Sequence, residues 1–285
     1  MGFMRMESSS VFPVLKVKKT NGIETIGFKG EMMMLKKWLA SVGIGSAKVD
    51  TQLDNTQLEP GQEVQGKVVI QGGNTEQQID RIQLFVMTEV VREKDDRKVY
   101  DNVVLDSFSI GQSFVIQEGE RKEIDFQFTL PVHTPPTFKK TKVWIQTGLD
   151  VPNAIDPNDR DFIQVKPHSY MNILLDALTN HLGFQLRKVE MEYSRRYRYV
   201  QEFEFLPGNE FRRDLDELEA MFFMKENGVD VLLQVDRRAK GIGSLFDEAL
   251  DMDESFVRLT FPANELKSDT SSVADTLRRT IQQHS

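Results

Sequence analysis

Apolar and polar residues alternate strictly in several separate segments of this chain. In residues 123–130, EIDFQFTL, the apolar Ile124, Phe126, Phe128 and Leu130 are separated by polar side chains. Successive side chains of a β-strand point to opposite faces, so this pattern predicts a strand with one face in a core and the other in water. Antiparallel sheets are the sheets that bury one face in this way.

Similar segments recur along most of the chain. Further strands are predicted within residues 64–70, 79–93, 103–110, 143–151, 161–166, 201–207, 219–225, 228–237 and 256–261. Many strands with short connections and few intervening helices favour β-sandwiches over alternating βαβ units. A chain of 285 residues also lies near the upper size of a single core. We therefore predict an all-β protein of two tandem antiparallel β-sandwich domains, residues 34–166 and 167–262.

Helical periodicity is confined to short segments at the ends of these domains. The apolar residues of 35–42 fall at i, i+3, i+4 and i+7, which predicts a short amphipathic helix before the first sandwich. Residues 169–182 predict a second helix, early in the second domain, that ends at Gly183. Residues 263–285 are polar with a narrow apolar stripe, so we expect a flexible tail or a short, partner-docked helix there.

Residues 1–33 differ from the rest of the chain because their apolar residues follow neither the period of two of a strand nor the period of about 3.6 of a helix. The codons of residues 29–31, Lys-Gly-Glu, can spell a purine-rich ribosome-binding sequence just before the methionines at 32–34. We therefore predict that translation starts in this methionine run, with Met34 favoured, and that residues 1–33 are an untranslated leader. A disordered N-terminal arm is the alternative.

Charge and composition disfavour several classes of function. With 36 basic and 44 acidic residues the net charge is 36 − 44 = −8, which repels nucleic-acid phosphates and anionic lipids. The absence of cysteine excludes disulfides, thiolate catalysis and cysteine zinc sites. No apolar run reaches the roughly 18–20 residues that span a bilayer, and no signal peptide is recognisable. The sequence predicts a cytoplasmic protein without nucleic-acid binding or stable membrane insertion.

No catalytic or metal-binding constellation is recognisable in the sequence. The four histidines, His133, His168, His181 and His284, are scattered without metal-ligand spacing. The two GIGS sequences continue neither as a dinucleotide fingerprint nor as a phosphate loop. We therefore predict that the protein is not an enzyme and uses neither a cofactor nor a metal.

Residues 191–200, MEYSRRYRYV, interleave aromatic and basic side chains. The candidate partner-binding residues are Tyr193, Arg195, Arg196, Tyr197 and Arg198. In one continuous strand the tyrosines would share one face, and Arg196 and Arg198 the other. These residue types can stack on bases, which the chain's acidity disfavours. A solvated edge strand and a site whose arginines bind an acidic partner segment remain open.

Three longer segments resemble the bacterial sporulation-control protein family: MLKKWLASVGIGSAKVDTQLDN, PGQEVQGKVVIQGGNTEQQID and TGLDVPNAIDPNDRDFIQV. The resemblance extends from Met34 to about Phe261, and the family typically begins near Met34. It implies an arrestin-like fold of two β-sandwich domains and a noncatalytic role in the control of sporulation. It further implies action through contacts with cytoplasmic proteins, among them cell-division or sporulation regulators, and it carries over no catalytic residues.

The segment 150–161, DVPNAIDPNDRD, concentrates charged side chains: Asp150, Asp156, Asp159, Arg160 and Asp161. It fails as an EF-hand loop counted from Asp156, because Asp161 stands where that loop requires glycine. The resemblance places this segment before the domain junction, where arrestins have a charged network, so we expect it to set the interdomain angle. The alternative is a nonstandard divalent-ion or ligand site, which would make the protein a sensing module.

Overall fold

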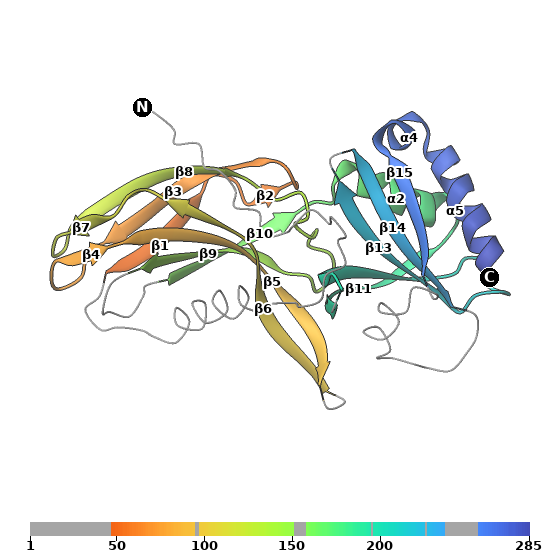
Figure 1. The fold of residues 1–285 in the computed structure, drawn as a ribbon, viewed down its shortest axis with the longest axis horizontal. Coiled ribbons are helices and arrows are strands. Elements are labelled where there is room, and N and C mark those ends of the chain that lie inside the picture. The colour runs from red at the N-terminus through yellow and green to blue at the C-terminus, as the bar shows by residue number, and fades with distance from the viewer. Residues whose placement is uncertain (1–46, 95–96, 151–157, 195, 226, 237–255) are drawn as a thin grey trace, which may run out of the picture. The chain divides into compact units, whose positions relative to one another are not determined.

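The computed structural model describes residues 47–285 except 95–96, 151–157, 195, 226 and 237–255 (Figure 1). The predicted leader, the predicted N-terminal helix, Asp156 and Arg195 lie outside the described residues. The described chain is mostly β-structure with few helices, as predicted.

The chain divides into two compact units, and the division is not the single break predicted at residues 166 and 167. Among the described residues, the first unit comprises 47–88 together with Val104–Leu130 and Val143–Gln164. The second unit comprises Glu89–Val103, Pro131–Lys142 and Val165–Ser285. The difference arises because β5 (Arg81–Lys94) and β6 (Arg97–Ile110) are 14 residues each, more than twice the usual strand length of about 5–6 residues. Each strand therefore contributes residues to both units.

Short antiparallel pairings build the first unit. One sheet has the order β1-β3-β8, made of β1 (Lys48–Leu53), β3 (Glu63–Gln71) and β8 (Arg121–Thr129). A second set follows the order β5-β9-β10-β2, with β9 (Val143–Asp150), β10 (Asn158–Val165) and β2 (Gln57–Leu58), and β6 pairs with β5. The strands β4 (Gln77–Ile79) and β7 (Phe114–Ile116) pair with each other.

The predicted alternation in residues 123–130 is confirmed in β8. Phe126 and Phe128 are buried, whereas Asp125 and Thr129 are exposed. Phe128 stacks on Phe108 with 4.3 Å between ring centroids. One face of this strand therefore lies in the core of the first unit, as the period of two requires.

The second unit has one antiparallel sheet with helices on one face (Figure 1). Its strand order is β15-β14-β13-β12-β11, from β11 (Gln185–Ser194), β12 (Arg198–Leu206), β13 (Glu217–Lys225), β14 (Gly228–Asp236) and β15 (Val257–Pro262). The helical elements are α2 (Ser169–Asp176), the π-helix η1 (Ala177–His181), α4 (Ala263–Ser268) and α5 (Thr270–His284). Apolar residues of the sheet and the helices form one continuous buried cluster, which is the core of this unit.

The helix predicted early in the second domain is confirmed, including its end at Gly183. Gly183 has a φ of 74°, a left-handed conformation that favours glycine after a helix. The π-helical last turn was not predicted: Leu182 N donates to Ala177 O at 3.0 Å. The strands predicted within residues 219–225 and 228–237 are also confirmed, and they form a hairpin in which β13 and β14 pair up to Lys225 and Gly228.

The C-terminal residues, expected as a flexible tail or a short helix, form α4 and the 15-residue α5. Val273, Leu277 and Ile281 are each 0% exposed and belong to the core of the second unit. The narrow stripe therefore packs on this chain's own sheet rather than on a partner, and α5 covers core that would otherwise face water.

Candidate functional site

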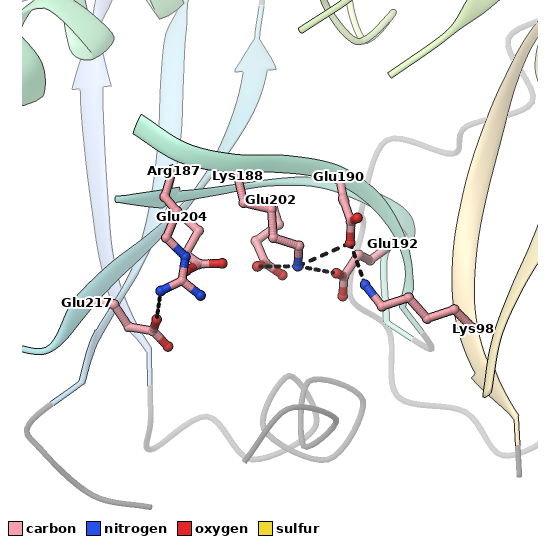
Figure 2. Close-up of polar contacts among 8 residues, drawn as sticks. All are labelled: Lys98, Arg187, Lys188, Glu190, Glu192, Glu202, Glu204 and Glu217. Atoms are coloured by element: carbon pink, nitrogen blue, oxygen red, sulfur yellow. Dashed lines mark hydrogen bonds and ion pairs between the residues drawn. The ribbon is translucent and has the colours of Figure 1, made fainter. Parts of the chain in front are cut away.

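The sheet of the second unit has two chemically different faces. One face is apolar and lies under the helices. The other carries glutamates at alternate positions of β11, β12 and β13, and most of them are drawn in Figure 2. We call this set the glutamate face: Glu190, Glu192, Glu202, Glu204, Glu217 and Glu219. Two of its members are almost fully buried, Glu202 at 3% exposure and Glu204 at 5%.

The strand register places carboxylates directly opposite each other. Glu190 is the partner of Glu202 between β11 and β12, and Glu204 is the partner of Glu219 between β12 and β13. Like charges opposite each other destabilise a sheet, and glutamate is almost never fully buried without a partner. The glutamate face therefore opposes folding locally, and such conflicts are expected at functional sites.

Lys188 lies at the centre of the glutamate face (Figure 2). Its Nζ is 3.1 Å from Glu190 Oε2 and 3.4 Å from Glu192 Oε1. The distance from the same Nζ to Glu202 Oε1 is 3.8 Å. Lys98, on β6, adds a second cation with its Nζ 2.9 Å from Glu190 Oε2. One ammonium is thus shared among three carboxylates.

A bulge in β11 adds a third cation to the same face. The register between β11 and β12 shifts between Leu186 and Lys188, so Arg187 has no partner in the ladder. Its Nε lies 2.6 Å from Glu204 Oε1, and its Nη1 lies 3.6 Å from Glu217 Oε2. Without the bulge, alternation would send Arg187 to the opposite face from Lys188.

Burial and mutual repulsion shift the pKa values of these groups. Burial, with the charges of Glu192 and Glu219, raises the pKa of Glu202 to about 9. Burial and the neighbouring Glu217 raise the pKa of Glu219 to about 7. Burial opposes the charge of Lys188, but Glu202 and Glu192 outweigh it and raise the pKa of the ammonium. At neutral pH the glutamate face therefore holds protons that ordinary glutamates have released.

Several carboxyl oxygens of this face lack a hydrogen-bond donor among the described residues. They are Glu202 Oε2, Glu204 Oε1 and Glu219 Oε2. Arg187 Nε is at ion-pair distance from that oxygen of Glu204, but it is not in hydrogen-bond geometry. Buried acceptors without donors cost free energy, so this part of the face is suited to receiving donors from a ligand.

The described candidate partner-binding residues lie in the turn between β11 and β12 and at the adjoining ends of these strands. We call the described ones, Tyr193, Arg196, Tyr197 and Arg198, the arginine–tyrosine turn. Tyr193 lies across from Tyr199, with 6.4 Å between ring centroids. The guanidinium carbons of Arg196 and Arg198 lie 5.5 Å and 5.8 Å from the rings of Tyr197 and Tyr199. The turn therefore presents cations held beside aromatic rings.

The prediction that the three tyrosines share one face is wrong. Tyr197 lies in the turn, where its N–H donates to Ser194 Oγ at 3.2 Å. Its ring lies 4.7 Å from that of Phe223 and packs beside Val200, which belongs to the opposite face from Tyr199. The prediction assumed one continuous strand, in which side chains alternate between the two faces. The chain turns after Ser194, so the alternation does not continue through Tyr197 into β12.

The aspartate-rich segment is only partly described, and the described members are in the first unit. Asp150 ends β9, and Asp159, Arg160 and Asp161 lie on β10. Asp159 Oδ2 accepts a hydrogen bond from Thr51 N at 2.7 Å. Burial, followed by the charge of Asp159, raises the pKa of Asp161 to about 7.

Arg160 does not lie among these aspartates. Its guanidinium carbon is 4.7 Å from the ring centre of Trp144, and its Nε donates to Gln146 Oε1 at 3.4 Å. Strand alternation explains this separation, because Arg160 and its two aspartate neighbours point to opposite faces of β10. Within the described part of the chain, no three histidine, aspartate or glutamate side chains are grouped so that they could hold a metal ion.

Comparison with known proteins identifies the family of this chain. The family described as "SpoOM protein" matches residues 35–239. The sporulation-control protein Spo0M of Bacillus subtilis (strain 168) is 40% identical over 258 residues, which is 89% of this chain and 99% of that protein. This chain belongs to the Spo0M family. The crystal structure of Spo0M from Bacillus subtilis matches with a TM-score of 0.78 and 39% identity, over 85% of this chain and 100% of that one.

The family resemblance predicted from the sequence is therefore confirmed. The Spo0M-family match contains the glutamate face, the arginine–tyrosine turn and the described aspartates of β10. Among the described helices, none combines the length and the hydrophobicity needed to cross a membrane.

Sequence reasoning missed the glutamate face. In QEFEFL, residues 201–206, Glu202 and Glu204 alternate with Phe203 and Phe205. That pattern predicted a strand with its polar face in water, yet both glutamates are buried. The sequence signal for this face is the presence of glutamates at alternate positions of several strands. These glutamates form a cluster only when the strands pair side by side.

Proposed function

We propose that this Spo0M-family protein is a noncatalytic cytoplasmic regulator of sporulation that acts through contacts with other proteins, such as cell-division or sporulation regulators. The name of the Bacillus subtilis relative supports the role in sporulation, because the match covers 99% of that protein. The two antiparallel sheets of the first unit support an arrestin-like β-sandwich there. The second unit departs from the predicted sandwich, because helices and not a second sheet cover the apolar face of its single sheet.

The arginine–tyrosine turn is the observation that carries the proposed mode of action. Arginine and tyrosine are enriched where proteins bind each other, since both offer a large contact area with polar ends. Arg196 is exposed, and Tyr197 is fixed by Phe223 and by a 2.9 Å hydrogen bond from Arg258 to its hydroxyl. The turn thus offers preorganised cations that suit an acidic segment of a partner.

Replacing Arg196 and Arg198 of this turn should strongly reduce capture of the partner. The test variant combines Arg196→Gln with Arg198→Asn, because Arg198 has a φ of 66° and asparagine tolerates this conformation. Tagged full-length protein is expressed in cells entering sporulation, and the captured proteins are quantified by mass spectrometry. We expect sporulation or division regulators to be captured by the wild type and to fall by about tenfold or more with the variant.

A matched control removes the same charge elsewhere in the second unit. Lys139 also has a positive φ, 51°, and Lys139 and Lys140 are both exposed. The variant Lys139→Asn with Lys140→Gln should capture the same proteins as the wild type. Equal loss with both variants, or equal capture by all three proteins, would refute a role for the arginine–tyrosine turn.

A ligand- or metal-sensing role for the aspartate-rich segment has weaker support. Asp159 and Asp161 form a close carboxylate pair, but the described residues supply no group of three metal ligands. The role of Asp150, Asp159, Arg160 and Asp161 in setting the interdomain angle remains a prediction.

A further inference from the structure

The glutamate face contains fewer cations than carboxylates. Among the described residues in contact there, six carboxyl groups stand against three cations, which are Lys98, Arg187 and Lys188. Glu202 and Glu219 have raised pKa values, so the excess of negative charge grows as the pH rises. The cations concentrate at one side, since Lys188 and Lys98 both contact Glu190. Glu202 receives only the 3.8 Å approach of Lys188, and Glu202 Oε2 has no donor among the described residues.

The oxygens without good donors lie close together on adjacent strands. Glu202 and Glu204 are two residues apart on β12 and share a face, about 7 Å apart along the strand. Glu219 lies directly across from Glu204, at a distance of about 5 Å between Cβ atoms. Three acceptor groups therefore converge on an area that a single multivalent donor can cover.

We propose that the glutamate face binds an arginine side chain presented by a segment of a partner protein, with Glu202 and Glu204 as the principal acceptors. This inference rests on the proposed function, because it names the chemistry of one partner contact. Guanidinium has five N–H donors in a planar fork and is weakly hydrated, so it fits clustered carboxylates at a lower desolvation cost than ammonium. The charge of the face selects a cationic segment over an acidic one.

Movement of the Arg187 side chain can give the partner's arginine access to Glu204. Its side chain is 52% exposed and lies between Glu204 and Glu217, at 2.6 Å and 3.6 Å. A small rotation toward Glu217 releases Glu204 while keeping the cation paired. Lys188 is 32% exposed on a flexible stem, so it too can yield space above Glu202.

The probe is a fluorescein-labelled peptide, Gly-Arg-Leu-Arg-Leu-Arg-Gly, titrated against the full chain at pH 8 with fluorescence anisotropy as the readout. The matched probe carries citrulline in place of each arginine and so keeps the shape without the charge. The test variant is Glu202→Gln with Glu204→Gln, which removes two carboxylates. The control is Glu63→Gln with Glu123→Gln, which removes two exposed carboxylates from the first unit.

We expect the arginine peptide to bind the wild type and the control equally, and to bind the test variant about tenfold or more weakly. Affinity of the wild type should rise from pH 6 to pH 9, because protons compete with the peptide for the carboxylates, and this rise should be smaller in the test variant, which keeps only Glu219 of the three acceptor groups. Circular dichroism checks that the test variant is folded.

Equal affinity for the wild type and the test variant overturns the proposal, as does absence of binding. Equal binding of the citrulline probe also overturns it, because the charge would then not matter. None of these outcomes affects capture through the arginine–tyrosine turn, so failure here is distinguishable from failure of the proposed function.

Discussion

Replacing Glu202 with glutamine is expected to stabilise the protein at neutral and alkaline pH while leaving it nearly unchanged at pH 5. The pKa of this carboxyl is raised from 4.5 to about 9 by burial and by the neighbouring glutamates. The folded state therefore keeps a proton that the unfolded chain releases above its ordinary pKa. The wild type loses stability as the pH rises through this window, and glutamine, which never ionises, does not.

The expected gain for Glu202→Gln is on the order of 3 kcal/mol at pH 7, from about 1.4 kcal/mol per pH unit above the ordinary pKa. The measurement is the free energy of unfolding from urea titrations at pH 5, 6, 7 and 8. The matched control is Glu123→Gln on β8, because that glutamate is exposed and pairs with Arg121 and Lys67. A pH profile of Glu202→Gln that parallels the wild type would show that Glu202 ionises normally in the folded protein.

Leu277→Ala is expected to destabilise the second unit by about 3 kcal/mol. Leu277 is 0% exposed in α5 and belongs to the buried cluster between the helices and the sheet. Truncation to alanine removes apolar contact and leaves a cavity that the surrounding side chains fill only in part. Urea unfolding at pH 7 measures the loss.

Gln283→Ala is the control for this substitution, since Gln283 is exposed on the same helix. We expect its effect to stay within about 0.5 kcal/mol, as for surface positions generally. If Leu277→Ala were as mild as the control, α5 would not be part of the folded core, and the original expectation of a flexible tail would be restored.

Local pattern was enough to predict much of the fold. The alternation of Phe126 and Phe128 with polar neighbours identified β8, and Gly183 marked the end of the helical segment. The stripe of α5 was visible too, but a sequence does not show whether an apolar stripe packs on its own domain or on a partner. The length of β5 agrees with the strand predicted within residues 79–93, but alternation within a strand does not show which domain each residue joins, so the contribution of β5 and β6 to both units was not predicted.

The candidate site was less predictable, for two physical reasons. The residues of the arginine–tyrosine turn were found from composition, but their faces were wrong because a turn interrupts the strand at Ser194 and Arg198. The glutamate face depends on strand register, which brings Glu204 opposite Glu219, and on a bulge that adds Arg187. Neither register nor a bulge can be read from the alternation within one strand.

We propose that this protein regulates sporulation through contacts made by its arginine–tyrosine turn, and this role can be tested in cells. The most direct measurement is the yield of heat-resistant spores in a Bacillus subtilis strain that lacks its own Spo0M and expresses this chain. We expect the wild type and the Lys139→Asn, Lys140→Gln control to restore the parental yield, and the Arg196→Gln, Arg198→Asn variant to fail at equal protein level. Failure of the wild type to restore the yield, or full restoration by the arginine variant, would show that the turn does not control sporulation in this way.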